Sequence, residues 1–379
     1  MKHTWDIFCS VVDNYGDIGV CWRLARQLAG GLDQSVRLWV DDLASFQRIC
    51  GAVDPARETQ MVGAVEVRRW SAVFPAAEPR AIVIEGFGVR LPANYLAAMA
   101  ARTPPPVWIN LEHLSAEPWV DGCHGLPSPH PTLPLTKYFF FPGFTRTTGG
   151  LLIERELAPA RAAFQADTQA RARFWHGLGV APDAAALRVS LFCYDNAALA
   201  GLVAAWSSGA SPVLCVVPEG VAVDRLSTLL DTKIAPGTHA VRGSLTVAAI
   251  PFLDAAAYDR LLWACDVNFV RGEDSFVRAQ LAARPLVWQA YVQSADAHMT
   301  KQSAFLERYI EGLDGRTAAA LRGIHVAWNR QSSAIAECWR SFISARAAAD
   351  RHALAWAARL ERGGNLAIRL AEFCQDRLK

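Results

Sequence analysis

Short apolar runs alternate with helix-length amphipathic segments along most of this 379-residue chain, and the alternation restricts its possible folds more than any other feature. Each run is rich in Val, Ile, Phe or Trp and is too short for a buried helix, so each predicts a strand. Strands that alternate with helices form a parallel sheet with helices on both faces. The expected strands are residues 5–12, 35–40, 65–70, 81–85, 107–111 and 138–141, then 187–194, 212–217, 245–250, 267–270 and 286–289.

The strands fall into two series, and a chain of this length exceeds one ordinary core. Residues 142–167 between them contain Pro and Gly pairs and then an Ala-rich, charged pattern, while the chain beyond about residue 300 has only helical patterns. We therefore expect an α/β protein with two facing Rossmann-like domains, residues 1–155 and 156–379, and C-terminal helices that can pack back on the N-terminal domain. This is the layout of the GT-B glycosyltransferase fold. A single doubly wound domain with a helical appendage is the alternative.

Composition narrows the class of protein. The net charge is +2 and no basic stripe is present, which argues against a general nucleic-acid binder. No apolar run reaches the ~18–20 residues that span a bilayer, and the first residues lack the apolar core of a secretory signal. The nine cysteines are scattered without a CxxC pair, as is typical of reduced thiols. We expect a soluble, cytoplasmic protein that binds neither nucleic acid nor membranes.

The first candidate site follows the first strand, in the sequence Asp13-Asn14-Tyr15-Gly16-Asp17-Ile18-Gly19. Open α/β sheets bind ligands at such strand-to-helix turns. The loop lacks the three glycines of a dinucleotide fingerprint and the Gly-Lys-Ser/Thr of a P-loop. It offers two carboxylates beside glycines that allow close approach of a ligand, and such a pair can orient and deprotonate a nucleophile. The alternative is that Asp13 or Asp17 only caps the following helix.

The second candidate site is the turn Arg271-Gly272-Glu273-Asp274-Ser275, between the strand at 267–270 and a helical pattern. We expect Asp274 or Ser275 at the N-cap of that helix. Its first N–H groups and the positive end of its dipole suit a diphosphate, and Arg271 can bond the same oxygens. Glu273 suits sugar hydroxyls or an ion pair with Arg271 better than a phosphate. A surface salt bridge on an ordinary turn is the alternative.

Weaker candidates lie at other strand ends. Aromatic side chains there can stack on a nucleobase, although such residues more often belong to the core; these are Phe192, Tyr194 and Phe252. Asp41-Asp42 predicts a helix cap, Glu85 a position at the crevice, and Glu112-His113 a structural hydrogen bond. The chain has no D-x-D motif of the kind that holds Mn²⁺, so we expect catalysis without a metal or other cofactor.

Several of these segments together resemble the bacterial protein-arginine rhamnosyltransferases that modify elongation factor P. The likeness runs over essentially the whole chain and rests on specific motifs. These are Ile7-Phe8-Cys9 with residues 13–20 and Trp22-Arg23-Leu24-Ala25-Arg26, Ile109-Asn110-Leu111-Glu112-His113-Leu114-Ser115-Ala116-Glu117 with Trp119, Phe141-Pro142-Gly143-Phe144, and residues 271–276 with Arg278-Ala279-Gln280.

The resemblance implies a GT-B enzyme that transfers L-rhamnose from dTDP-β-L-rhamnose to one arginine of elongation factor P, with inversion. It implies that Asp17 or Asp13 is the base at the acceptor and that Glu273 is a further functional acid. The donor contacts that we expect are Asn14, Tyr15, Gly16, Phe192, Tyr194, Phe252, Arg271, Gly272, Asp274, Ser275 and Gln289. Two alternatives stay open. One is another nucleotide-sugar or nicotinamide enzyme, which the missing fingerprint and missing Tyr-x-x-x-Lys pair disfavour; the other is a non-catalytic nucleotide-binding adaptor of a translation factor.

Overall fold

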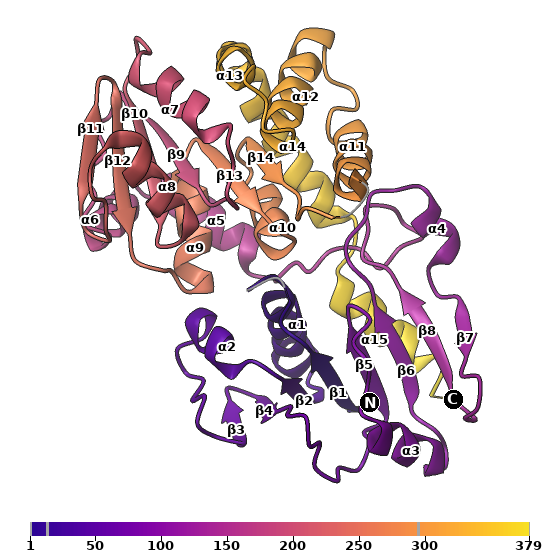
Figure 1. Ribbon diagram of the computed structural model, residues 1–379. Coiled ribbons are helices and arrows are strands. Elements are labelled where there is room, and N and C mark those ends of the chain that lie inside the picture. The colour runs from indigo at the N-terminus through magenta and orange to yellow at the C-terminus, as the bar shows by residue number, and fades with distance from the viewer. Residues whose placement is uncertain (1, 13–14, 294–295, 379) are drawn as a thin grey trace. The chain divides into compact units, whose positions relative to one another are not determined.

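The computed structural model describes residues 2–12, 15–293 and 296–378. The chain forms two compact units, one of Met1–Glu154 with Leu360–Lys379 and one of Arg155–Arg359 (Figure 1). The expected second domain, residues 156–379, therefore differs from the observed unit at its C-terminal end. Residues 360–379 belong to the first unit because the apolar face of their helix packs into its core. Within the described ranges, no helix combines the length and the apolar character needed to cross a membrane.

The first unit is built on an eight-stranded sheet in the order β3-β4-β2-β1-β5-β6-β8-β7. Its parallel strands are β1 (Thr4–Cys9), β2 (Ser35–Val40), β4 (Val65–Arg69), β5 (Ile82–Gly86), β6 (Val107–Leu111) and β8 (Thr136–Phe140). Two short antiparallel strands form the edges, β3 (Thr59–Val62) and β7 (Pro127–Pro129). The helices are α1 (Gly16–Arg26) with a π-helical extension at Gln27–Gly31, α2 (Leu43–Ile49), α3 (Ala93–Ala101), α4 (Trp119–Cys123) and α15 (Leu366–Gln375).

Both faces of this sheet are covered, as the side-chain alternation of the central strand β1 shows. Ile7 and Cys9 belong to a cluster that includes residues of α1 and α15. Phe8, between them, points to the opposite face and packs against Trp39 and Tyr95, the latter on α3. Because successive strand side chains face opposite ways, an all-buried strand of this kind requires a layer on each side.

The second unit is built on a six-stranded sheet in the order β11-β12-β10-β9-β13-β14. Its parallel strands are β9 (Leu187–Leu191), β10 (Val213–Pro218), β12 (Leu245–Ile250), β13 (Val267–Arg271) and β14 (Leu286–Gln289), with antiparallel β11 (His239–Arg242) at one edge. The helices are α5 (Leu157–Ala166), α6 (Thr168–Gly177), α7 (Leu199–Ser207), α8 (Val221–Leu230), α9 (Ala255–Ala264), α10 (Asp274–Leu281), α11 (Ala297–Tyr309), α12 (Gly315–Asn329), α13 (Ile335–Ser344) and α14 (Arg346–Arg362).

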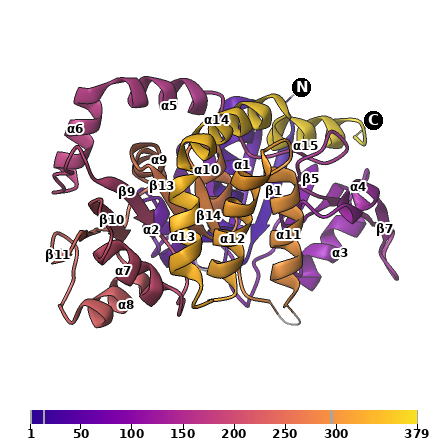
Figure 2. The ribbon, with the colours of Figure 1, turned by 90° about the horizontal axis from the view of Figure 1, so that it is seen from above.

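Strand β13 divides the layers of the second unit in the same way. Phe269 contacts three tryptophans, Trp206 on α7, Trp328 on α12 and Trp339 on α13. Asn268 faces the other side and donates to the carbonyl of Leu262 on α9 at 3.0 Å. Helices α11, α12 and α13 lie side by side in both views (Figures 1 and 2). The sheet is thus buried between helical layers, which explains why its central strands are mostly apolar.

The expected strands are all present, but two of them end three residues earlier than the sequence predicts. The first ends at Cys9 rather than residue 12, and that of residues 187–194 ends at Leu191. Phe192 and Tyr194 consequently lie in the loop beyond β9, at the carboxyl edge of the sheet. This is the edge where parallel α/β sheets bind ligands.

Candidate functional site

Asp17 lies in the first turn of α1, just beyond the carboxyl end of β1, and is 6% exposed. Its Oδ2 accepts a hydrogen bond from the backbone N–H of Val12 at 2.9 Å. The helix N-cap is Tyr15, whose side chain makes no capping bond. Asp17 is therefore a buried carboxylate that holds the loop before the helix. It is not the N-cap of α1, which was the alternative to a functional role.

Asp13 and Asn14 lie outside the described residues. The structure therefore describes one carboxylate of the predicted pair, that of Asp17. Tyr15 and Gly16, on the helical side of the loop, are half-buried. The described part of the loop thus contains Asp17, Tyr15 and Gly16 at one strand end, as the sequence predicts.

The neighbouring strand ends of the first unit carry a second polar group. Glu85, near the end of β5, is 3% exposed and accepts from Lys137 Nζ at 2.8 Å. Burial raises the pKa of Glu85, and the hydrogen bond from Lys137 opposes that shift. Asn110 on β6 accepts from Gly88 N at 3.0 Å and donates to Glu112 Oε1 at 2.6 Å. These contacts stabilise the edge of the sheet beside the Asp17 loop.

Two of the weaker candidates have structural partners. Asp42 is the N-cap of α2 and accepts from Ala44 N and Ser45 N, which confirms the predicted cap. Asp41 instead accepts from Ser10 Oγ at 2.5 Å and from Val11 N at 2.9 Å. Asp41 therefore ties the loop after β1 to the end of β2.

In the second unit, the turn between β13 and α10 has a different cap from the predicted one. The N-cap is Glu273, and Asp274 is the first residue of the helix. Asp274 does not cap because its carboxylate bonds to Arg278 one turn further along the same helix, at 2.7 Å. Gly272 adopts φ = 64°, a left-handed conformation that side-chain-bearing residues rarely adopt. Its carbonyl accepts from Trp288 Nε1 at 2.8 Å, which fixes the turn against β14.

Arg271, at the carboxyl end of β13, is held by two aromatic rings. Its guanidinium carbon lies 4.5 Å from the ring centroids of both Phe192 and Tyr194. The backbone N–H of Tyr194 donates to Gln289 Oε1 at 3.0 Å, and Gln289 pairs with Arg271 across β13 and β14. The structure thus brings together four of the predicted donor contacts, and the two rings contact the arginine, an arrangement that the sequence analysis did not predict.

Phe252 is the remaining aromatic candidate of this unit. It follows β12, and β10 separates β12 from β9. Tyr258, which the sequence analysis missed, packs edge-on against Phe192 at 5.8 Å. Burial raises the pKa of Tyr258.

Two further charged residues lie beneath the turn; Arg278 belongs to a motif of the family resemblance, and Asp259 was missed. Arg278 on α10 and Asp259 on α9 are 6% and 9% exposed, and Arg278 Nη1 lies 2.9 Å from both Asp259 oxygens. The i, i+4 spacing of Asp274 and Arg278 was a visible signal for one half of this network. Asp259 gave none, because it belongs to another helix.

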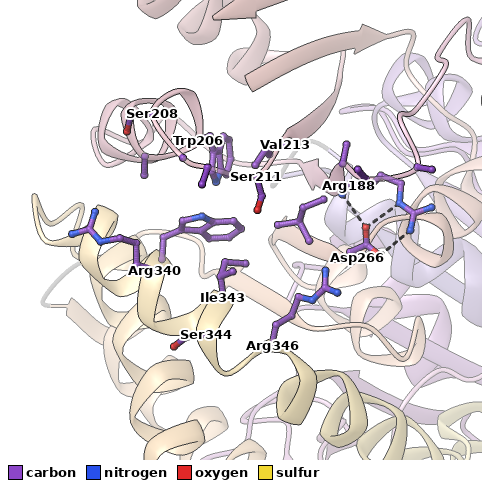
Figure 3. Close-up of a pocket in the computed structure, with 18 residues that line it drawn as sticks. Arg188, Trp206, Ser208, Ser211, Val213, Asp266, Arg340, Ile343, Ser344 and Arg346 are labelled. Atoms are coloured by element: carbon purple, nitrogen blue, oxygen red, sulfur yellow. Dashed lines mark hydrogen bonds and ion pairs between the residues drawn. The ribbon is translucent and has the colours of Figure 1, made fainter. Parts of the chain in front are cut away.

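A cavity of about 750 Å³ lies at the opposite, amino edge of the same sheet (Figure 3). Its lining includes Arg188 at the start of β9 and Asp266 just before β13, which form an ion pair at 2.9 Å. The Arg271 turn is at the other end of β13, so this cavity is separate from the candidate site. In the ranges that the structure describes, no three His, Cys, Asp or Glu side chains are grouped so as to hold a metal ion.

Two Rossmann-like units, with candidate site residues at the carboxyl ends of their strands, have the architecture of the GT-B class of glycosyltransferases. A family model described as "Elongation-Factor P (EF-P) rhamnosyltransferase EarP" matches residues 5–375. The chain belongs to this family.

Individual relatives agree with the family match. A protein-arginine rhamnosyltransferase of Pseudomonas putida is 48% identical over 379 residues, with 100% of both chains covered. One of Pseudomonas aeruginosa is 46% identical over 374 residues and covers 98% of this chain and 99% of its own. A solved structure described as "Structural basis for EarP-mediated arginine glycosylation of translation elongation factor EF-P" matches with a TM-score of 0.72 at 35% identity, covering 99% of both chains.

Proposed function

We propose that this protein transfers L-rhamnose from dTDP-β-L-rhamnose to an arginine side chain of EF-P, with inversion at the anomeric carbon and without a metal. The proposal that the protein binds this donor rests on the position of Arg271, which contacts Phe192 and Tyr194 and precedes the N-terminus of α10. A fixed guanidinium and the first N–H groups of a helix together suit a diphosphate. The names of the relatives supply the sugar and the acceptor.

The donor chemistry follows from charge. As the glycosidic bond breaks, the diphosphate leaving group gains negative charge. Arg271 and the positive end of α10 stabilise that charge more in the transition state than in the bound donor, which is what accelerates the reaction. Glu273, at the N-cap, bonds sugar hydroxyls in this proposal. A single displacement by the acceptor nitrogen on the face opposite the leaving group gives inversion.

The acceptor chemistry requires a carboxylate that acts as a base. A guanidinium has a pKa above ~12, so at neutral pH it stays protonated and is a poor nucleophile. Asp17 is the described carboxylate best suited to this role, since it is 6% exposed and fixed by Val12 N–H. A carboxylate can bind the guanidinium in two places and accept a proton as the new C–N bond forms. Asp13 is the second acid of the same loop in the proposal.

The test is intact-mass spectrometry of purified EF-P after incubation with this protein and dTDP-L-rhamnose. We expect a gain of one deoxyhexose, mapped by fragmentation to a single arginine. A parallel reaction with EF-P in which that arginine is lysine should show no gain. No gain on unsubstituted EF-P, although calorimetry detects dTDP binding, would reject the sugar or the acceptor. Neither gain nor dTDP binding would favour the adaptor alternative.

A further inference from the structure

Three charged side chains form a buried network directly beneath the proposed diphosphate site. Arg278 donates through Nη1 to both oxygens of Asp259 at 2.9 Å and through Nε to Asp274 Oδ2 at 2.7 Å. The side chains of Arg278, Asp259 and Asp274 are 6%, 12% and 15% exposed. One guanidinium thus links helix α9 to the first turn of helix α10.

Stability alone gives little reason for such a network. A buried ion pair is often no more stabilising than apolar side chains of the same volume, because desolvating the charges offsets their attraction. Here a single cation faces two carboxylates at the end of a helix that is proposed to bind an anion. A role in the binding of that anion would explain the arrangement.

The position of Asp274 supplies this reason. An aspartate at the first residue of a helix favours the same N–H groups that a phosphate would use, and its charge repels the phosphate. Arg278 lies one turn nearer the carboxyl end and holds the Asp274 carboxylate along the flank of the helix. Asp259, on a separate helix, fixes the guanidinium from the other side. The network therefore restrains the Asp274 carboxylate, which would otherwise compete with the donor for these N–H groups.

We infer that Asp259 and Arg278 are positioning residues for the diphosphate of the donor: they hold the Asp274 carboxylate along the flank of α10, so that the N-terminal amides of α10 and Arg271 bind the phosphates. The inference rests on the proposed function, because it concerns the same nucleotide-diphosphate site. Neither residue touches the donor; both act through Asp274.

The test uses calorimetric binding of dTDP to the full chain at low and high salt. A double variant, Asp259→Asn with Arg278→Gln, removes both buried charges together, so the net charge of the group is unchanged, but Asp274 loses the guanidinium that holds it. We expect dTDP affinity to fall about tenfold at low salt, and less at high salt, because the released Asp274 carboxylate can approach the phosphates and repel them through a screened interaction. Adding Asp274→Asn to the double variant should restore affinity to within about threefold of the unsubstituted chain. A purely structural role would give no such restoration.

The chain offers a matched control in the Arg188–Asp266 pair, at the amino edge of the same sheet (Figure 3). The variant Arg188→Gln with Asp266→Asn removes a comparable pair and should leave dTDP affinity unchanged. If thermal unfolding shows that the Asp259–Arg278 double variant is not folded, Arg278→Lys, which keeps the buried charge but loses the planar fork, makes the same comparison with and without Asp274→Asn.

Three results would overturn the inference. They are unchanged affinity in the folded double variant, failure of Asp274→Asn to restore affinity, and an equal loss in the Arg188–Asp266 control. Absence of dTDP binding by the unsubstituted chain is a different failure, which would reject the proposed donor class itself.

Discussion

Arg271 is held by its contacts with Phe192 and Tyr194, since the guanidinium carbon lies over both rings, 4.5 Å from each centroid. A stacked guanidinium loses little further side-chain entropy when it binds a phosphate, because its orientation is set in advance. A lysine in the same place would have neither the planar face nor the fork.

Replacing Arg271 with Ala should therefore weaken dTDP binding by ~1.5–3 kcal/mol, the usual range for a hydrogen bond to a charged group. Calorimetry measures the affinity directly. Arg260→Ala, an exposed arginine on α9, is the control and should bind dTDP normally. Equal affinity of the Arg271 variant and the unsubstituted chain would reject the donor contact.

Replacing Asp17 with Asn tests the acceptor base. The amide oxygen can still accept the hydrogen bond from Val12 N–H, so the loop should keep its shape. We expect dTDP affinity within a few-fold of normal and rhamnosylation of EF-P reduced by at least ~10²-fold, the usual contribution of a general base. Turnover close to normal in a mass-spectrometric time course would show that Asp17 is not the base.

At this scale the sequence predicted most of the residues but few of their contacts. Arg271, Tyr194 and Gln289 were recognisable because each lies at or just beyond the end of an apolar run. That Arg271 stacks on Phe192 depends on the pairing of β9 with β13, which are distant in the chain. Asp259 was missed for the same reason, because nothing local marks a residue whose partner belongs to another helix.

Helix caps contribute to the stability of the first unit, and the contribution of the N-cap of α2 can be measured. Its cap, Asp42, accepts from Ser45 Oγ at 2.5 Å and from Ser45 N and Ala44 N, each at 3.0 Å. The hydrogen bonds from Ser45 hold the pKa of Asp42 below its usual value. A carboxyl group with a lowered folded-state pKa stabilises the fold above its unfolded-state pKa, and this contribution disappears as the pH falls through the folded-state pKa.

Asp42→Ala should accordingly lower the free energy of unfolding by about 1 kcal/mol at neutral pH, the usual cost of losing an N-cap. The difference should shrink as the pH falls from the ordinary Asp pKa of ~3.9 through the lower folded-state pKa, where the cap takes up its proton. Urea unfolding at several pH values measures it. Asp42→Asn keeps an uncharged cap and should retain stability throughout, so an equal loss in both variants would contradict the capping role.

The elements missed by the sequence analysis are the three antiparallel edge strands, β3, β7 and β11. Exposed residues interrupt all three strands, so they lack the continuous apolar run that marked the central strands. β7 also begins and ends with proline, which disfavours a strand except at an edge. Their pairing is determined by the neighbouring strand rather than by their own composition.

At the scale of the whole molecule, the first unit is discontinuous in the chain, since it contains both Met1–Glu154 and Leu360–Lys379. The C-terminal helix α15 contributes Leu366, Leu370 and Cys374 to the core that surrounds β1 and α1. The sequence predicted terminal helices and the option that they return to the N-terminal domain. It could not predict the packing partner, because an amphipathic helix shows which face is buried and not what covers it.

Leu370→Ala tests this packing. Leu370 is 0% exposed, so the variant should lose ~2–5 kcal/mol of stability through lost burial and the cavity left behind. Ile368→Ala, on the same helix but 45% exposed, should change stability by no more than ~0.5 kcal/mol. Differential scanning calorimetry can compare both with the unsubstituted chain, and equal effects would show that α15 does not belong to the core.

The return of the chain to the first unit also has a consequence for its synthesis. A ribosome delivers the strands of the first sheet early, and then the whole of Arg155–Arg359, before α15 exists. Until Leu366–Gln375 emerges, the hydrophobic cluster that contains Leu28 and Leu152 lacks the apolar side chains that α15 contributes to it. The nascent protein therefore holds an unfinished N-terminal unit through most of translation, while the inserted unit has all of its own chain and can fold first.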